Sequence, residues 1–286
     1  MRHIVVGAVA YAPQIVPIWD IIRDYANAYF KDIRLDYVLF SNYERQVQWL
    51  IDGKIDIAWN TNVAYIRSQH ITHNAMQAVL MRDTDRDFQS VFVARENTIG
   101  NIEDLRGKRF GLGSLDSAQA AIMPLHFLRQ HAFKLEEMTS PLQAVPQDTL
   151  GIYRFNTDVG KHGDTGRSEF EILDRIRAGE LDAGAIGSST WARILHEGSY
   201  PSLKSFYVSK PYCHCNFTLP LDFDKGLKEV FITMMTSQNA LKSNANIAQM
   251  MSLEGLNEWI VCDEKILMGY EEIHRAMLEQ NLMTGY

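Results

Sequence analysis

Short apolar segments that read as strands alternate along this chain with longer segments that read as amphipathic helices. Residues 3–9 and 33–39 are apolar runs of strand length, and residues 16–30 between them carry apolar side chains at helical spacing. Residues 55–59 repeat the strand pattern after a second helical segment. Because a strand–helix–strand order produces parallel strands covered by helices, we predict an α/β fold.

The chain has 286 residues, enough for two domains of moderate size. Hydrophobic residues make up 46% of the sequence and charged residues 22%, which is typical of a soluble globular protein. No stretch of about 18 consecutive apolar residues occurs, so we predict no membrane span.

Acidic and basic residues are interspersed along the chain, and the formal net charge is −7. A protein that follows a nucleic acid backbone needs Lys and Arg concentrated on one face. We therefore expect no nucleic acid partner. A small anionic ligand remains compatible with this composition, because it requires only a local positive potential.

The N-terminal apolar run, residues 4–10, follows Arg2 and resembles a short export signal. It lies at the short end for such a signal, and residues 11–13 offer no convincing cleavage site. A buried first strand explains the run better. The protein is expected to be cytoplasmic as the sequence stands, or periplasmic if an export signal has been removed.

Four short motifs occur in an order that is typical of one family. They are DLRGKRF at residues 104–110, DIAW at 56–59, GELDAG at 179–184 and GYEEI at 269–273. Each motif alone is weak, but together they span almost the whole chain. The sequence resembles the substrate-binding proteins of phosphate/phosphonate-type ABC transporters.

The resemblance implies a type II periplasmic-binding-protein fold, in which two α/β lobes enclose a ligand cleft and the chain crosses between the lobes twice. We place the crossovers near residues 88–93 and 208–217. Lobe 1 would then comprise residues 1–90 and 210–286, and lobe 2 residues 91–209. The implied partners are a small-molecule ligand and an ABC transporter permease, and no cofactor is expected.

In this architecture, ligands bind at loops that follow strands and at helix N-termini, where unpaired amides and the helix dipole favour anions. The residues that meet these conditions are Tyr11, Tyr43, Asn60, Thr61, Ser117, Gln119, Arg167, Glu169 and Ser188. Among them, Arg167 is the best cation for an anionic ligand. In the same loops, Ser41 and Ser168 could instead be helix caps, because a cap requires the same residue types.

Three positions depart from what the family commonly has. Residues 117–119 read Ser-Ala-Gln where relatives typically have Ser-Thr-Ser, and Glu169 stands where relatives commonly have His. An acidic group that relatives carry on the return crossover falls near Cys215. The resemblance with these departures implies a small polar or anionic ligand other than a simple phosphonate.

The most unusual segment is Cys213-His214-Cys215, on the second expected crossover. If the segment is extended, both cysteines point to one side and His214 to the other. The cysteines could be small buried residues, weak zinc ligands, or a thiolate nucleophile activated by His214 or Glu169.

Two alternatives to the transporter function follow. The first is a cytoplasmic enzyme on the same fold, decarboxylase-like or cofactor-biosynthetic, with Cys213, His214, Cys215 and Glu169 as candidate catalytic residues. The second is a cytoplasmic metabolite sensor. His70-x-x-His73 has a spacing found in metal sites, but no neighbouring acid or cysteine completes it, so we expect no metal.

Overall fold

The computed structural model describes residues 2–10, 12–155 and 167–284, and the chain divides into two compact units. Unit 1 consists of Met1–Asp87, Cys213–His274 and Asn281–Tyr286, and unit 2 of Phe88–Tyr212 and Arg275–Gln280. The chain therefore passes between the units at the start of the first predicted crossover and within the second. The C-terminal helix adds two further passages, after His274 and after Gln280, which the sequence did not predict.

Unit 1 contains one six-stranded sheet. Its strands are β1 (Arg2–Val9), β2 (Ile33–Phe40), β3 (Ile57–Asn60), β4 (Met76–Arg82), β11 (Asn216–Pro220) and β12 (Trp259–Val261). Its helices are α1 (Ile15–Tyr29), α2 (Tyr43–Ile51), α3 (Asn62–Ile71), α7 (Lys225–Ser237), α8 (Ala245–Glu254), α9 (Glu264–Met268) and the start of α10 (Glu271–Glu279). The strand order is β12-β4-β11-β3-β1-β2.

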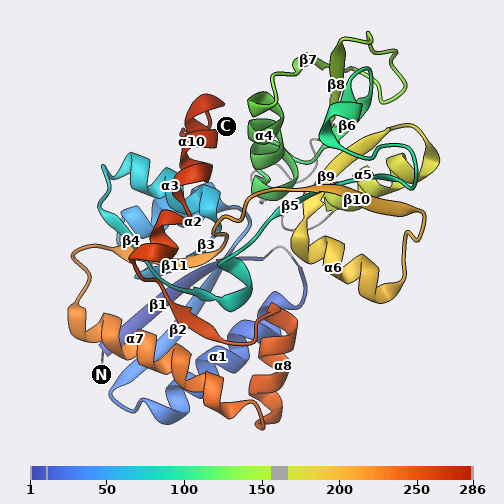
Figure 1. Ribbon diagram of the computed structural model, residues 1–286. Coiled ribbons are helices and arrows are strands. Elements are labelled where there is room, and N and C mark those ends of the chain that lie inside the picture. The colour runs from blue at the N-terminus through green and yellow to red at the C-terminus, as the bar shows by residue number, and fades with distance from the viewer. Residues whose placement is uncertain (1, 11, 156–166, 285–286) are drawn as a thin grey trace. The chain divides into compact units, whose positions relative to one another are not determined.

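Helices cover both faces of this sheet: α1, α7 and α8 lie on one side, and α2 and α3 on the other (Figure 1). In β1, Ile4 and Val6 belong to the core that the sheet shares with α1, α7 and α8. Val9 belongs to the second core, together with Val47 of α2. Because both faces are buried, the first strand reads as a continuous apolar run. This confirms the interpretation of residues 3–9 as a buried strand.

Unit 2 contains a second six-stranded sheet. Its strands are β5 (Ser90–Arg95), β6 (Arg109–Leu112), β7 (Lys134–Glu137), β8 (Thr149–Arg154), β9 (Ala183–Gly187) and β10 (Leu203–Val208). Its main helices are α4 (Met123–Gln130), α5 (Arg167–Ala178) and α6 (Ser188–Glu197), and a π-helical turn, Ala118–Ile122, precedes α4. The strand order is β10-β5-β9-β6-β8-β7. On one face, Val91 and Val93 pack in a core with residues of α5 and α6.

Both sheets have the same switch in strand order. In unit 1, β1 pairs in parallel with β2 on one side and with β3 on the other. In unit 2, β6 pairs in parallel with β8 and β9 in the same way. The loops that leave the carboxyl ends of such strands diverge to opposite faces of the sheet and leave a crevice, which is the usual ligand position in open α/β sheets.

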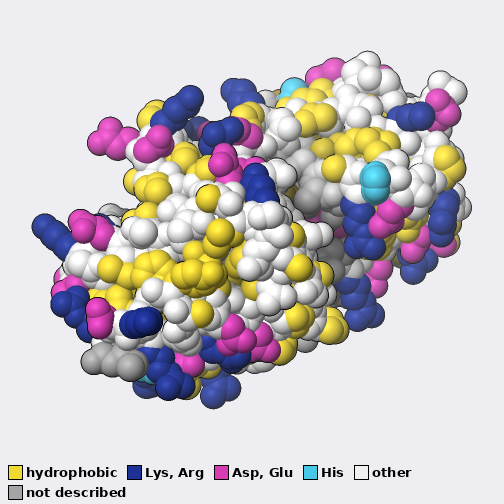
Figure 2. Space-filling view, turned by 90° about the horizontal axis from the view of Figure 1, so that it is seen from below, with side chains coloured by type: hydrophobic (Ala, Val, Ile, Leu, Met, Phe, Trp, Pro, Cys, Tyr) yellow, Lys and Arg dark blue, Asp and Glu magenta, His cyan; other side chains and the backbone are white. Residues whose placement is uncertain are grey.

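The surface of unit 1 that carries α1, α7 and α8 is visible in the view from below. Hydrophobic side chains gather there in a band, and on the described part of this face basic and acidic side chains are interspersed around it (Figure 2). Tyr29, at the end of α1, is 65% exposed.

None of the helices in the described residues is both long enough and apolar enough to cross a membrane.

A bidentate ion pair ties β6 to the start of β9 in unit 2. Nε and Nη2 of Arg109 each donate to one carboxylate oxygen of Asp182 at 2.9 Å, and the Arg109 backbone N–H donates to Oδ2 at 2.9 Å. Burial by itself would raise the pKa of Asp182, but the hydrogen bonds and charge of Arg109 hold this pKa below the ordinary value of 3.8.

We predict that Asp182→Asn lowers the free energy of unfolding by about 2 kcal/mol at neutral pH, because it removes the charge from a half-buried pair. A carboxylate with a lowered pKa stabilises the fold above its unfolded pKa, and this stabilisation is lost as the pH falls through the folded pKa. The difference between wild type and variant in urea unfolding should therefore shrink below about pH 4. Asp148→Asn, at an exposed pair with Lys134, is the control and should change stability little. An equal effect of both variants would contradict the prediction.

Candidate functional site

Three of the predicted ligand-binding residues lie at strand ends in unit 1. Asn60 is the last residue of β3, and Thr61 caps α3 by accepting a hydrogen bond from the Ala64 N–H at 3.4 Å. Tyr43 is the first residue of α2, whose cap is Asn42 and not Ser41. The side chains of Tyr43, Asn60 and Thr61 are all buried. Tyr11 lies outside the described residues.

Asn60 is joined to a residue that sequence reasoning missed. Gln46 of α2 donates through Nε2 to Asn60 Oδ1 at 2.8 Å and to the carbonyl of Trp59 at 2.9 Å. Nδ2 of Asn60 and Oε1 of Gln46 are buried and have no hydrogen-bond partner among the described residues. A buried amide without a partner costs free energy, so this donor and this acceptor are candidates for contact with a ligand or a water molecule.

Unit 2 brings together three more of the predicted residues. Ser117 caps the π-helical turn by accepting from the Ala120 N–H at 3.2 Å, and Gln119 lies in that turn. Gln119 Nε2 donates to Glu169 Oε1 at 3.0 Å, and the Gly187 N–H donates to Glu169 Oε2 at 2.8 Å. The carboxylate of Glu169, which is 1% exposed, thus links the turn after β6 to the end of β9.

The loop between β6 and this turn packs closely against α5. A Cβ atom on Gly113 would lie 2.8 Å from Ala120 Cβ and 2.9 Å from Ser168 Oγ, so this close approach requires glycine. Ser168 lies within the first turn of α5, and its Oγ accepts from the Ser114 N–H at 3.5 Å. The interpretation of Ser168 as a helix cap is therefore wrong.

The two remaining predicted residues are placed differently. Arg167, at the start of α5, has a side chain that is 68% exposed and lies 3.7 Å from Glu171, one turn further along the helix. Ser188, the first residue of α6, accepts through Oγ from the Gln89 N–H at 3.3 Å. Ser188 directly follows Gly187 and so borders the Glu169 group.

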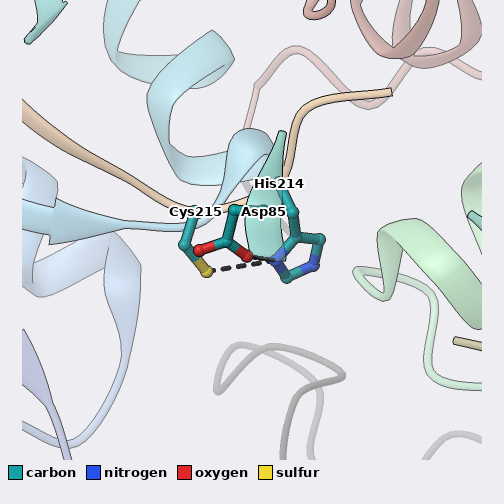
Figure 3. Close-up of side chains that lie close together, drawn as sticks. All are labelled: Asp85, His214 and Cys215. Carbon is teal, nitrogen blue, oxygen red and sulfur yellow. Dashed lines mark hydrogen bonds and ion pairs between the residues drawn. The ribbon is translucent and has the colours of Figure 1, made fainter. Parts of the chain in front are cut away.

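A buried charged cluster in unit 1 was also missed. Arg82 donates to both carboxylate oxygens of Asp85, at 2.5 and 2.9 Å, and to the backbone carbonyl of Glu254 at 2.6 Å. Nδ1 of His214 lies 3.5 Å from Asp85 Oδ1 and 3.1 Å from Cys215 Sγ (Figure 3). Burial alone would raise the pKa of Asp85, but Arg82 and His214 lower it to about 2.

The predicted orientation of the Cys-His-Cys segment is wrong. The side chains of His214 and Cys215 lie together beside Asp85 (Figure 3). The Cys213 thiol donates to the backbone carbonyls of Arg86 and Ile266 at 3.3 and 3.2 Å. Residues 213–215 precede β11 and are not part of a strand, so strict alternation of side chains does not apply to them.

Neither thiol of this segment is prepared for nucleophilic attack. Burial raises the pKa of Cys213 to about 12 and that of Cys215 to about 11, so both remain protonated at neutral pH. In a catalytic triad, the acid and the nucleophile contact opposite ring nitrogens of histidine. Here Asp85 and Cys215 both contact Nδ1 of His214. The arrangement therefore differs from that of a catalytic triad.

The same cluster is the one group of three possible metal ligands within 4.8 Å of one another among the described residues. Arg82 uses Nε and Nη2 to bind both carboxylate oxygens of Asp85. A metal ion on Asp85 would have to lie against this guanidinium charge. The cluster is better described as a neutralised acid than as a metal site.

Comparisons with known proteins identify relatives over almost the whole chain. The model of a family described as "ABC transporter, phosphonate, periplasmic substrate-binding protein" matches residues 8–258. The probable ABC transporter phosphite binding protein PhnD1 of Prochlorococcus marinus (strain MIT 9301) is 23% identical over 263 residues, which cover 86% of this chain and 80% of PhnD1.

Two solved structures have the same fold. XAC2383 from Xanthomonas citri, bound to ATP, is 13% identical, with a TM-score of 0.76 and 98% of each chain covered. PhnD1 from Prochlorococcus marinus in complex with methylphosphonate is 18% identical, with a TM-score of 0.69 and 98% of each chain covered. Together with the two sheets described above, these neighbours confirm the predicted two-lobed periplasmic-binding-protein fold. Because the family model covers most of the chain, the protein belongs to the family of phosphonate-type periplasmic substrate-binding proteins of ABC transporters.

Proposed function

We propose that this protein binds a small molecule that carries a phosphonate- or sulfonate-type oxyanion and also a hydrogen-bond-donating group. Its family membership makes it the substrate-binding component of an ABC transporter, with a small-molecule ligand and a permease as partners. The observation that carries the finer proposal is the buried carboxylate of Glu169 at a strand-end position in unit 2.

The oxyanion would be bound by groups at strand ends of the two lobes predicted from the sequence, residues 1–90 with 210–286 and residues 91–209. The N-terminus of α3 and the Nδ2 donor of Asn60 offer hydrogen-bond donors in unit 1. In unit 2, the turn capped by Ser117 begins with backbone N–H groups close to the end of β6. These donors suit a tetrahedral oxyanion such as the phosphite and methylphosphonate named for PhnD1.

The second part of the ligand would face Glu169. The one polar group of a simple phosphonate is the negatively charged phosphonate itself. The Glu169 carboxylate would repel this group. A terminal amine or other donor on the same ligand would instead form a charge-assisted hydrogen bond with the carboxylate. This agrees with the expectation, from the departures at residues 117–119 and at Glu169, that the ligand is not a simple phosphonate.

The first of three predictions from the proposed function concerns the oxyanion. Asn60→Asp preserves the acceptor for Gln46 but replaces the buried donor with a negative charge. We expect the affinity for the tightest-binding member of a panel of phosphonates and sulfonates to fall at least about tenfold by calorimetry. Asn101→Asp, at an exposed helix cap, is the control and should bind normally. An Asn60→Asp protein that melts normally and binds with full affinity would exclude Asn60 from the site.

The second prediction concerns the donor group. 2-Aminoethylphosphonate differs from ethylphosphonate by one amine. It should bind at least about tenfold more tightly, because one charge-assisted hydrogen bond contributes enough free energy for this difference in affinity. Glu169→Gln should remove this preference, whereas Glu136→Gln on exposed β7 should preserve it. If wild type binds both compounds equally, the proposed donor group is wrong, even if the protein is a transporter component.

The third prediction tests the enzyme alternative, which the comparisons do not support. With both thiol pKa values raised by burial, Cys213 and Cys215 should react with iodoacetamide at neutral pH only as fast as the protein unfolds. The labelling of each cysteine can be followed by mass spectrometry against denaturant concentration. Fast labelling of either thiol in the folded protein, blocked by ligand, would revive a catalytic role.

A further inference from the structure

We propose that unit 1 contains a binding site for a zinc-class divalent metal ion, formed by His70, His73, Glu271 and His274. These four side chains line one cavity of about 400 Å³ between the end of α3 and the start of α10. The sequence analysis dismissed His70-x-x-His73 because no neighbouring acid completes it. The fold supplies an acid and a third histidine from about 200 residues further along the chain.

The four residues form two pairs with the same spacing. His70 lies in the last turn of α3 and His73 two residues beyond the end of that helix, whereas Glu271 and His274 both lie in the first turns of α10. On a helix, residues at this spacing lie on the same face. Imidazole nitrogens and carboxylate oxygens are ordinary ligands of zinc, which prefers four of them in a tetrahedron.

The backbone at His73 has an unusual conformation. His73 and Asn74 have φ angles of 53° and 66°, in the left-handed region that few residues other than glycine adopt. The turn is held by hydrogen bonds from the His73 N–H to the His70 carbonyl at 3.3 Å and from the Asn74 N–H to the Gln69 carbonyl at 2.7 Å. It ends α3 while keeping His73 on the cavity, and strained backbone of this kind is concentrated at functional sites.

The four donor side chains are exposed and are not held by polar contacts among the described residues. None of them has a side-chain hydrogen bond or ion pair there, and all four are exposed. The C-terminal end of α3 carries the negative end of the helix dipole, which favours a cation beside His70. The start of α10 carries the positive end of its own helix dipole, and the carboxylates of Glu271 and Glu272 offset this positive charge.

The donor atoms line the cavity without closing to coordination distance, since the one described group of three donors within 4.8 Å is the Asp85 cluster. Closing the site requires rotation of these four exposed side chains, and exposed side chains change rotamer within nanoseconds. The wall beside them is formed by two packed aromatic rings. The rings of Tyr65 and Tyr270 are buried and meet edge to face, with centroids 5.0 Å apart.

The inference is tested by titrating tag-free protein with ZnCl₂ in a calorimeter. Wild type should bind one Zn²⁺ per chain, and the His70→Ala/His274→Ala double variant should lose about a hundredfold or more in affinity. The control is His3→Ala/His196→Ala, which removes two histidines outside the cavity and should bind as wild type does. Saturating Zn²⁺ should raise the melting temperature of wild type and control but not of the site variant.

Substitution with Co²⁺ distinguishes this site from the Asp85–His214–Cys215 cluster. Binding to His70, His73, Glu271 and His274 predicts a cobalt spectrum without a thiolate charge-transfer band. A band that disappears in Cys215→Ser would overturn the assignment, as would zinc affinity unchanged in the double variant. If the double variant does not fold, Glu271→Gln replaces it, with a loss of at least about tenfold expected and an unchanged affinity overturning the proposal.

Discussion

The parallel pairing of β1 between β2 and β3, and of β6 between β8 and β9, is the constraint on which the rest of the structure depends. A parallel sheet needs helical crossovers, and the helices bury both of its faces. The strand ends, where the chain leaves the sheet, are then favourable places for polar side chains that meet a ligand. This explains why Asn60 and Glu169, which have little in common in the sequence, both follow or border a strand end.

The segments where the chain passes between the units carry backbone hydrogen bonds and a buried ion pair. Phe88 and Tyr212 exchange two backbone hydrogen bonds of 2.9 Å within unit 2, and in unit 1 the His214 N–H donates to the Asp85 carbonyl at 2.9 Å. The ion pair of Arg82 with Asp85 adds charge to this position. Removing one partner from such a buried pair is costly, because the other charge is left uncompensated. Cys213 and Cys215, which flank His214 in the chain, are both buried.

The fold as a whole was predictable, and several details of the site were not. Regular spacing of apolar residues indicated the α/β class, and four ordered motifs indicated the family, which the comparisons confirmed. The importance of Gln46 was missed because its partners lie 13 and 14 residues further along the chain, and that of Arg82 because Glu254 lies 172 residues away. The charged run at residues 82–87, beside an expected crossover, was the one available signal for the Asp85 cluster.

The sequence by itself determined which segments are strands, which are helices and where the polar strand ends fall, because these depend on local periodicity and on caps within a few residues. Only the tertiary structure decided which of those ends meet. It joined Gln119 to Glu169 across 50 residues, and it placed His70 and His274 on one cavity. It also turned His214 toward Cys215 where an extended chain would have separated them. Contacts of this kind depend on strand order and helix packing. The residue pattern within a short stretch of sequence does not encode either of these.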